Sequence, residues 1–278
     1  MRLSHRAMPV RAMLVRAIPV WAALLGALTL GPAVAQDMIR YLDLKSEDFT
    51  KAEVSRAEIE VLLAAAGPTS HIDLSGKRLN GLDLSALDLR RTKLQAARLN
   101  NAKLAGSNLD GVVLDQAWAL AADLTGATLR GASLFATQLQ GARLDRADLS
   151  QARIAADFTG ASLIEARFEG ANLSADMRNQ SMGLMRGVLR SAKLDRASFA
   201  NANLARVVLE FASLREANLK GANLTGAELA GADFAGADVA GADFEGADAT
   251  STRLLGLKGR DQARNFERLR NRERAFLD

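Results

Sequence analysis

The chain has 278 residues, of which 49% are hydrophobic but only 5% aromatic, so any core must be mainly aliphatic. It contains no cysteine and only two histidines, which excludes disulfides and thiol catalysis and argues against sites built on several histidines. The formal net charge is +4, but residues 1–35 hold four arginines and no acid. The remainder is therefore neutral and has no net attraction for nucleic acid.

Residues 1–35 are typical of a secretory signal peptide. A basic region is followed by an apolar stretch over 18–30 and by the small residues Ala33-Val34-Ala35 before Gln36. About 13 apolar residues are too few to cross a bilayer, which needs about 20. We expect cleavage between Ala35 and Gln36, export to the periplasm or extracellular space, and no transmembrane segment in the mature chain. An uncleaved anchor is the alternative.

Residues 36–70 form a segment that precedes the repetitive part of the chain. The pattern Thr50-x-x-Glu53 predicts a helix start with a capping box, and Gly67 with Pro68 predicts its end. Apolar residues recur between them at helical spacing, at Val54, Ala57, Val61 and Leu62. We expect this segment to supply a short capping helix.

Residues 71–257 repeat every five residues. A leucine recurs from Leu74 to Leu254 with two breaks in step; of 36 such central positions, 27 are Leu and 5 are Phe. Alanine stands two residues before the centre in 24 repeats, and glycine two residues after it in 16. Three residues in alternation place alanine and the centre on one face of the chain, and the remaining two must turn it. Non-glycine residues at some corners suggest that a positive φ is not required at every turn.

This pattern resembles the pentapeptide repeat family, whose motif is A-[D/N]-L-x-x. Matching stretches are Ala217-Asn218-Leu219, Ala222-Asn223-Leu224 and Ala242-Asp243-Phe244, each with the two residues that follow. The resemblance implies an all-β solenoid, a right-handed quadrilateral β-helix of about nine coils with four repeats in each. Residues four repeats apart should then stack, placing Asp73 beside Lys93 and Asp123 beside Arg143.

The period fails at three places, which become candidate partner surfaces. Trp118 points outward beside Ala119, where a central leucine is missing; a partner anchor and a stack on Arg98 compete with local repacking. The step shortens by one residue between Ile154 and Phe158. Between Leu173 and Leu184 eleven residues replace ten, as a protruding loop or a one-residue bulge. The full candidate set is Trp118, Phe135, Asp176, Met177, Arg178, Met182 and Phe211.

Residues 258–278 are rich in arginine, with Ala263, Phe266, Leu269 and Phe276 as an apolar stripe. We expect a C-terminal capping helix. Its alternatives are a dimer contact, since a dimer could form through the end caps, and an anion-binding tail.

These features predict a non-catalytic protein-interaction or scaffold protein outside the cytoplasm, with no cofactor, no metal, no catalytic residue and no nucleic-acid partner. The identity of the protein partner does not follow from the sequence. One alternative, which the resemblance implies, is a DNA-mimicking inhibitor or protector of a type II topoisomerase. Its carboxylates would be Glu228, Asp233, Asp238, Asp243 and Asp248. A second alternative is a carboxylate-based hydrolase using neighbouring aspartates.

Overall fold

A computed structural model describes residues 42–67, 70–175 and 185–278. These residues all belong to one compact unit, Gln36–Asp278. The expected signal peptide and its cleavage site at Ala35 and Gln36 lie outside the described residues. Within the described ranges, the structure contains no helix that is both long and apolar enough to cross a membrane.

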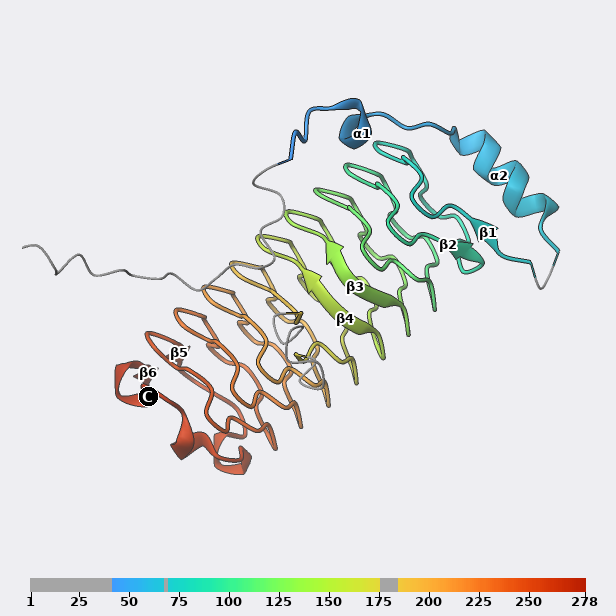
Figure 1. Ribbon diagram of the computed structural model, residues 1–278. Coiled ribbons are helices and arrows are strands. Elements are labelled where there is room, and N and C mark those ends of the chain that lie inside the picture. The colour runs from blue at the N-terminus through green and yellow to red at the C-terminus, as the bar shows by residue number, and fades with distance from the viewer. Residues whose placement is uncertain (1–41, 68–69, 176–184) are drawn as a thin grey trace, which may run out of the picture. The chain divides into compact units, whose positions relative to one another are not determined.

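The repeats wind into a stack of coils (Figure 1). Parallel bridges join Arg78 to Arg98, Asp123 to Arg143 and Asp233 to Arg253, in each case from one repeat to the fourth repeat after it. This register confirms that four five-residue repeats complete a coil. Where pairing is continuous enough it forms short strands: β1 (Ile72–Asp73) pairs with β2 (Thr92–Lys93), β3 (Ser133–Gln138) with β4 (Arg153–Asp157), and β5 (Arg253–Leu254) with β6 (Phe276–Leu277).

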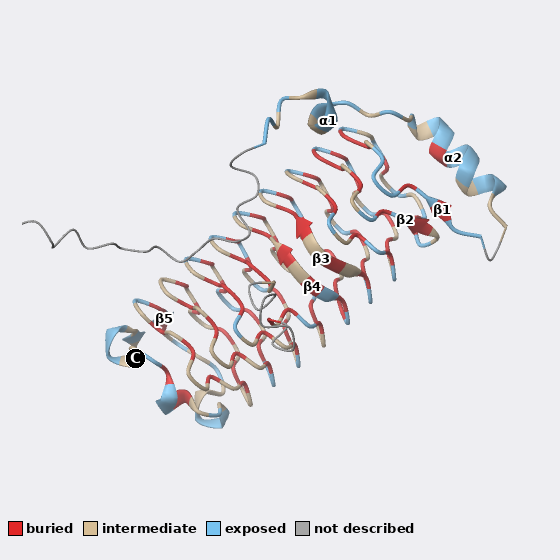
Figure 2. Cartoon of the chain, viewed as in Figure 1, coloured by how far each residue is buried: buried red, intermediate tan, exposed pale blue. Residues whose placement is uncertain are grey.

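The interior of the stack receives the alanines and the central leucines or phenylalanines, as the alternation predicts (Figure 2). Leu134 and Ala132 are fully buried, while Ser133 between them is half-buried on the outer side. The buried rings of Phe168 and Phe199 lie in successive coils and stack 4.7 Å apart. The core is therefore a continuous aliphatic column with occasional aromatic layers.

Most corners are tight turns closed by a backbone hydrogen bond, as from the Ala97 N–H to the Leu94 carbonyl at 3.0 Å. At most of them the third residue adopts a positive φ even where it is not glycine, as at Asn101, Gln151, Arg206 and Glu216, with φ between 56° and 61°. Arg91 holds the same place in a turn closed by the Thr92 N–H and the Leu89 carbonyl, and it is not among the residues with a positive φ. The left-handed conformation is therefore usual at the corners but, as expected, not required at every turn.

The N-terminal segment contains two helices, α1 (Glu47–Thr50) and α2 (Arg56–Ala65). The predicted capping box is wrong: Thr50 ends α1, and the box that starts α2 is formed by Ser55 and Glu58. Glu53 instead accepts the backbone N–H of Arg78. The chain between the helices pairs with the first coil, and this pairing delays the start of α2.

Of the apolar stripe predicted for this helix, Val54 packs against the core but Ala57 is exposed. Ile59 is fully buried against the core, and Leu63 packs beside it. Val61 and Leu62 are exposed, at 67% and 45%. The later helix start shifts the buried face, since each residue advances a helix by about 100°.

The expected C-terminal helix over 258–278 is absent. The described chain there forms three 3₁₀ turns, η3 (Arg260–Gln262), η4 (Phe266–Arg268) and η5 (Arg272–Arg274), followed by β6. These turns are corners of a final coil whose repeats have lengthened to six residues. The parallel pairs there lengthen accordingly, each spanning one residue more of sequence than the pair before it: Asp238–Lys258, Asp243–Arg264, Asp248–Arg270 and Arg253–Phe276.

The interpretation of residues 174–183 as a one-residue bulge is wrong as well. The ladder passes from Asn172 to Val188, which stacks on Asp157, so sixteen residues stand where five are usual. Eleven residues are therefore inserted, and the centre that follows Leu173 is Leu189 rather than Leu184. Leu184 lies outside the described residues.

Candidate functional site

The departures from the repeat meet at one edge of the stack. Two outward columns border this edge. The Arg153 column contains Lys93, Val113, Ser133, Arg153, Asn172, Asn203, Asn223 and Asp243, and the Trp118 column contains Arg98, Trp118, Gln138, Asp157, Val188, Val208 and Glu228. We call the edge where the chain passes from the first column to the second the Phe135 corner.

Three successive coils cross the Phe135 corner in three ways. From Ser133 to Gln138 the chain takes five residues, all in β3; from Arg153 to Asp157 it takes four, in β4; from Asn172 to Val188 it takes sixteen. Exceptions that are far apart in sequence are thus adjacent in space. The crossing from Ser133 to Gln138 keeps the five-residue step of the other corners along the described pentapeptide ladder, but the next two crossings do not.

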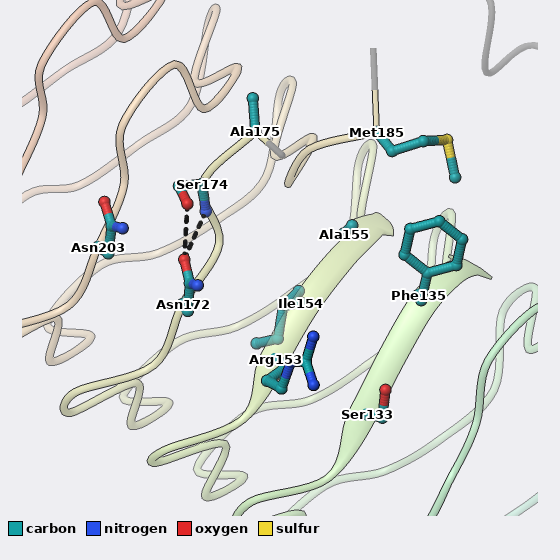
Figure 3. A pocket seen from close by; sticks show the side chains of 10 residues that line it. All are labelled: Ser133, Phe135, Arg153, Ile154, Ala155, Asn172, Ser174, Ala175, Met185 and Asn203. Atoms are coloured by element: carbon teal, nitrogen blue, oxygen red, sulfur yellow. Dashed lines mark hydrogen bonds between the residues drawn. The ribbon is translucent and has the colours of Figure 1, made fainter. Parts of the chain in front are cut away.

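A hollow of about 510 Å³ lies at this corner and extends over four coils (Figure 3). Its apolar part is formed around Phe135, Ala155 and Met185, and its polar part lies along the Arg153 column. The full lining is Ser133, Phe135, Arg153, Ile154, Ala155, Asn172, Ser174, Ala175, Met185 and Asn203. Among the described residues of the lining, Arg153 is the one charged side chain and no carboxylate is present.

Asp115, one coil earlier at the same corner, positions the aromatic side of the hollow. Its Oδ1 atom accepts the Ser133 hydroxyl at 2.7 Å and the Phe135 backbone N–H at 2.9 Å. The next residue, Ala136, has a φ of 56°. These contacts hold the backbone of β3 at the corner, so the ring of Phe135 is presented from a rigid element.

The guanidinium of Arg153 projects over the strand pair formed by β3 and β4 (Figure 3). Arg153 is exposed, and within the described residues it has no ion pair and no side-chain hydrogen bond. By contrast, Arg143 is paired with Asp123 at 3.8 Å. Arg153 therefore retains its full capacity to donate hydrogen bonds.

Among the predicted candidates, Trp118 is engaged within the chain. Its ring makes an edge contact with Phe49 at 5.3 Å, and Arg98 stacks over Phe49, also at 5.3 Å, rather than over Trp118. The tryptophan anchors the N-terminal segment on the side of the coils. The expectation of an Arg98–Trp118 stack was wrong because sequence alone does not show that Phe49 contacts both side chains.

The remaining candidates divide into two groups. Phe135 lines the hollow, whereas Phe211 is 66% exposed at a different corner, where its ring covers Gly231 of the next coil. The structure does not bring these two aromatics together. Asp176, Met177, Arg178 and Met182 lie outside the described residues.

Several residues of the hollow were not among the predicted candidates: Arg153, Asn172 and Asn203. The two asparagines are hidden by the repeat, because Asn is a regular residue at that position. One indication of Arg153 was present in the sequence, because this residue immediately precedes the shortened step at Ile154.

The carboxylates considered for a DNA mimic do not form a bare acidic surface. Four of them are in ion pairs: Glu228 with Arg186 at 2.9 Å, Asp233 with Arg253 at 3.7 Å, Asp238 with Lys220 at 3.0 Å, and Asp243 with Arg264 at 3.9 Å. Asp248 accepts the Asn271 side-chain amide at 2.9 Å. Charges paired in this way present a weaker field to a partner than free carboxylates do.

The aspartates considered for a hydrolase are used locally. Asp73 and Asp123 each accept the backbone N–H two residues later, at 2.9 and 3.0 Å. Hydrogen bonds from Ser75 lower the pKa of Asp73, and the pKa of Asp123 is lowered by Thr125 and Arg143 although burial opposes this. Paired catalytic carboxyls need one pKa raised. In the parts of the chain that are described, no group of three or more potential metal-ligating side chains is present.

Comparison with known families gives one match. The family model for pentapeptide repeats matches eight copies, at residues 121–151, 154–175, 192–229 and 227–258. No curated protein matches the chain.

Among solved structures, the chain is similar to HetL, a pentapeptide repeat protein involved in heterocyst differentiation regulation in the cyanobacterium Nostoc sp. strain PCC 7120. The two are 28% identical over 80% of this chain and 94% of HetL, with a TM-score of 0.44. It is also similar to QnrB1, a plasmid-mediated fluoroquinolone resistance protein, at 18% identity over 76% of this chain and 94% of QnrB1, with a TM-score of 0.41.

Proposed function

We propose that this chain, which belongs to the pentapeptide repeat family, is a non-catalytic interaction protein that acts outside the cytoplasm and binds a protein partner at the Phe135 corner. The observation that carries the proposal is that three successive coils cross this corner in three different ways, two of them with an unusual number of residues. Each repeat of a solenoid is stabilised by packing on similar neighbours, so a departure from the repeat costs stability. Departures gathered at one corner therefore indicate that the corner serves another purpose.

The hollow supports this choice over other parts of the surface. It combines an aromatic and a thioether side chain with one free guanidinium, and aromatic and arginine side chains are those on which protein interfaces most often depend. The other aromatic candidate at a corner, Phe211, is more exposed than the half-buried Phe135 but lies on a regular corner.

Export is part of the proposal and rests on the sequence. The basic, apolar and small-residue parts of 1–35 occur in the order that a signal peptidase substrate requires. Mass spectrometry of the N-terminus of the mature protein tests this point. A mature chain that begins at Gln36 is expected, and one that retains Met1 would contradict export with cleavage.

Proximity labelling in the producing cell tests the binding surface. The label is fused after Asp278 and the wild type is compared with Phe135→Ala, using Phe211→Ala as the matched control at another corner. We expect Phe135→Ala to lose a labelled protein that the wild type and Phe211→Ala retain. Identical labelling by all three would overturn the proposed surface. Labelling of a cytoplasmic topoisomerase would favour the DNA-mimic alternative.

A further inference from the structure

The hollow at the Phe135 corner presents hydrogen-bond donors far more readily than acceptors. The Oδ1 atom of Asn172 accepts both the backbone N–H and the hydroxyl of Ser174, at 3.1 and 2.7 Å. The Oδ1 atom of Asn203 accepts the Ala205 N–H at 3.2 Å and the Asn223 amide, also at 3.2 Å. These bonds require the oxygen at that position, and they fix which end of each side-chain amide faces the chain.

The side-chain amide nitrogens of Asn172 and Asn203 remain as available donors. In the described part of the chain, neither the Nδ2 group of Asn172 nor that of Asn203 donates to a protein acceptor. Arg153 stacks directly before Asn172 in the same column and is also unpaired. Ser133, the other polar group of this column in the hollow, donates its hydroxyl to Asp115.

Arg153, Asn172 and Asn203 therefore form a row of donors across three successive coils. Adjacent coils lie about 4.8 Å apart, so the row spans about 10 Å. An extended peptide rises about 3.3 Å per residue and would cover this row with about three residues. Phe135, Ala155 and Met185 form an apolar shelf on the corner side of the row.

We infer that the hollow binds an extended segment of a partner protein in which an acidic residue is flanked by apolar residues. This inference rests on the proposed function. The carboxylate pairs with Arg153, backbone carbonyls accept from Asn172 and Asn203, and an apolar side chain covers the shelf of Phe135 and Met185. The described lining residues include no carboxylate to pair with a basic segment, and their single cation, Arg153, is too few for the several phosphate contacts of a nucleic acid.

Fluorescence anisotropy with the purified full chain tests the inference. The probes are labelled peptides of sequence Gly-Leu-Asp-Leu-Gly, Gly-Leu-Asn-Leu-Gly and Gly-Leu-Lys-Leu-Gly, together with a short single-stranded oligonucleotide. We expect saturable binding of the aspartate peptide only, with a Kd below about 1 mM. Replacing its aspartate by asparagine should weaken binding about tenfold, since a charge-assisted pair is lost.

Variants decide whether Arg153 is responsible. Arg153→Gln should weaken the aspartate peptide about tenfold and make the aspartate and asparagine peptides bind alike. Lys193→Gln removes an exposed cation from a different column and should change binding less than about twofold. Phe135→Ala should weaken both peptides equally. Urea unfolding of each variant confirms that the coil stack is intact.

Three results would overturn the inference: no saturable binding of the aspartate peptide, preference for the lysine peptide or the oligonucleotide, or a preference for aspartate that survives Arg153→Gln. The proposed function fails separately. If Phe135→Ala still loses its labelled partner in the cell while the peptides fail, the corner is an interface and only its acidic specificity is wrong.

Discussion

The two ends of the stack are closed in different ways. At the N-terminal end a separate segment covers the first coils: Ala52 pairs antiparallel with Leu79, and Ile59 of α2 is buried against the core. At the C-terminal end the repeat closes itself. Its last coil lengthens to six residues per step, and Phe266 contacts Phe244 edge-on at 5.5 Å.

The chemistry of the two closures differs as well. The N-terminal segment is held by buried amides, since Asn80 donates to the carbonyls of Asp48 and Lys51, both at 3.0 Å. The C-terminal coil is held by its aromatic ring, over which Arg260 and Arg272 stack at 5.0 and 5.7 Å. A solenoid must protect both exposed edges; here a buried amide acts together with Ile59 and Phe49 at one end, and an aromatic ring of the last coil acts at the other.

The largest expected effect comes from removing the ring of Phe266 at the C-terminal end of the core. Phe266→Ala should lower the free energy of unfolding by about 3 kcal/mol, because the side chain is almost fully buried and leaves a cavity at the end of the core. Phe49→Ala, its counterpart at the other end, should cost about 1–2 kcal/mol because that ring is half-exposed. Urea unfolding measures both. Equal losses would contradict the asymmetry of the two closures.

The next effect concerns the start of the final coil. Gly259 has a φ of 65°, and a Cβ atom there would lie 2.6 Å from the Cβ of Ala240 and 3.0 Å from its nitrogen. Gly259→Ala should therefore cost about 2–3 kcal/mol, from both strain and overlap. Gly126→Ala is the matched control in a regular corner: its φ is 64° and its surroundings are open, so about 1 kcal/mol is expected. Thermal unfolding of the two variants measures both losses. A loss for Gly126→Ala as large as that for Gly259→Ala would contradict the prediction.

At the N-terminal end the amides should matter more than their exposed equivalents. Asn80→Ala removes both donors to the segment and the acceptor of the Asn100 N–H, and should cost about 1–3 kcal/mol. Asn108→Ala, in an outward column, should cost less than about 1 kcal/mol. Hydrogen exchange should show faster exchange of the Ile59 amide in the first variant only. Unchanged protection there would show that the amides do not hold the segment.

The smallest effect is a dependence on pH. Burial alone would raise the pKa of Asp243 and Asp248, but the side-chain amides of Asn265 and Asn271, with backbone N–H groups and nearby arginines, lower both below the ordinary value. A carboxyl whose pKa is lowered by folding stabilises the fold above its unfolded pKa. That stabilisation is lost as the pH falls through the folded pKa.

The final coil should accordingly loosen as the pH falls below about 4, the ordinary pKa of an aspartate. The hydrogen bonds of the Asn80 side-chain amide do not titrate in this range. One carboxyl at the same end does, since the Arg78 backbone N–H lowers the pKa of Glu53. Hydrogen exchange at stepped pH should therefore show the C-terminal end opening first, and Asn271→Ala should reduce the acid sensitivity. Simultaneous opening of both ends would contradict this prediction.

Much of the fold follows from the sequence because three positions of the repeat recur: the alanine, the central leucine or phenylalanine, and the corner glycine. The burial of Leu134 and Ala132 and the stacking of Asp123 on Arg143 one coil later were predicted and are confirmed. The shortened step after Ile154 was also located correctly. Local patterns determine these features, since each residue repeats the environment of the one five positions away.

Two predictions were wrong because a change in repeat length gave the same local spacing of apolar residues as a familiar pattern. In the last coil, Ala263, Phe266 and Leu269 are spaced by three, which is also a helical spacing, so the six-residue repeat was interpreted as an amphipathic helix. The eleven inserted residues add two five-residue steps and one more, and they end near a leucine. The insertion therefore looked like continued repetition with a small slip.

The candidate site was the least predictable part. Phe135 was recognised, but Arg153, Asn172 and Asn203 were not, because an outward polar residue is ordinary in every repeat. Only the stacking of coils shows that Arg153 is unpaired, and that the oxygens of the two asparagines are used by their own turns.

The sequence by itself determined the period, the residues that fill the core and the positions at which the repeat is interrupted, since these depend on interactions between near neighbours. The tertiary structure decided which interruptions lie together, how each end is closed and which charges are paired. Those outcomes depend on contacts between coils, which join residues at least a full turn of the solenoid apart in sequence, and no local pattern specifies them.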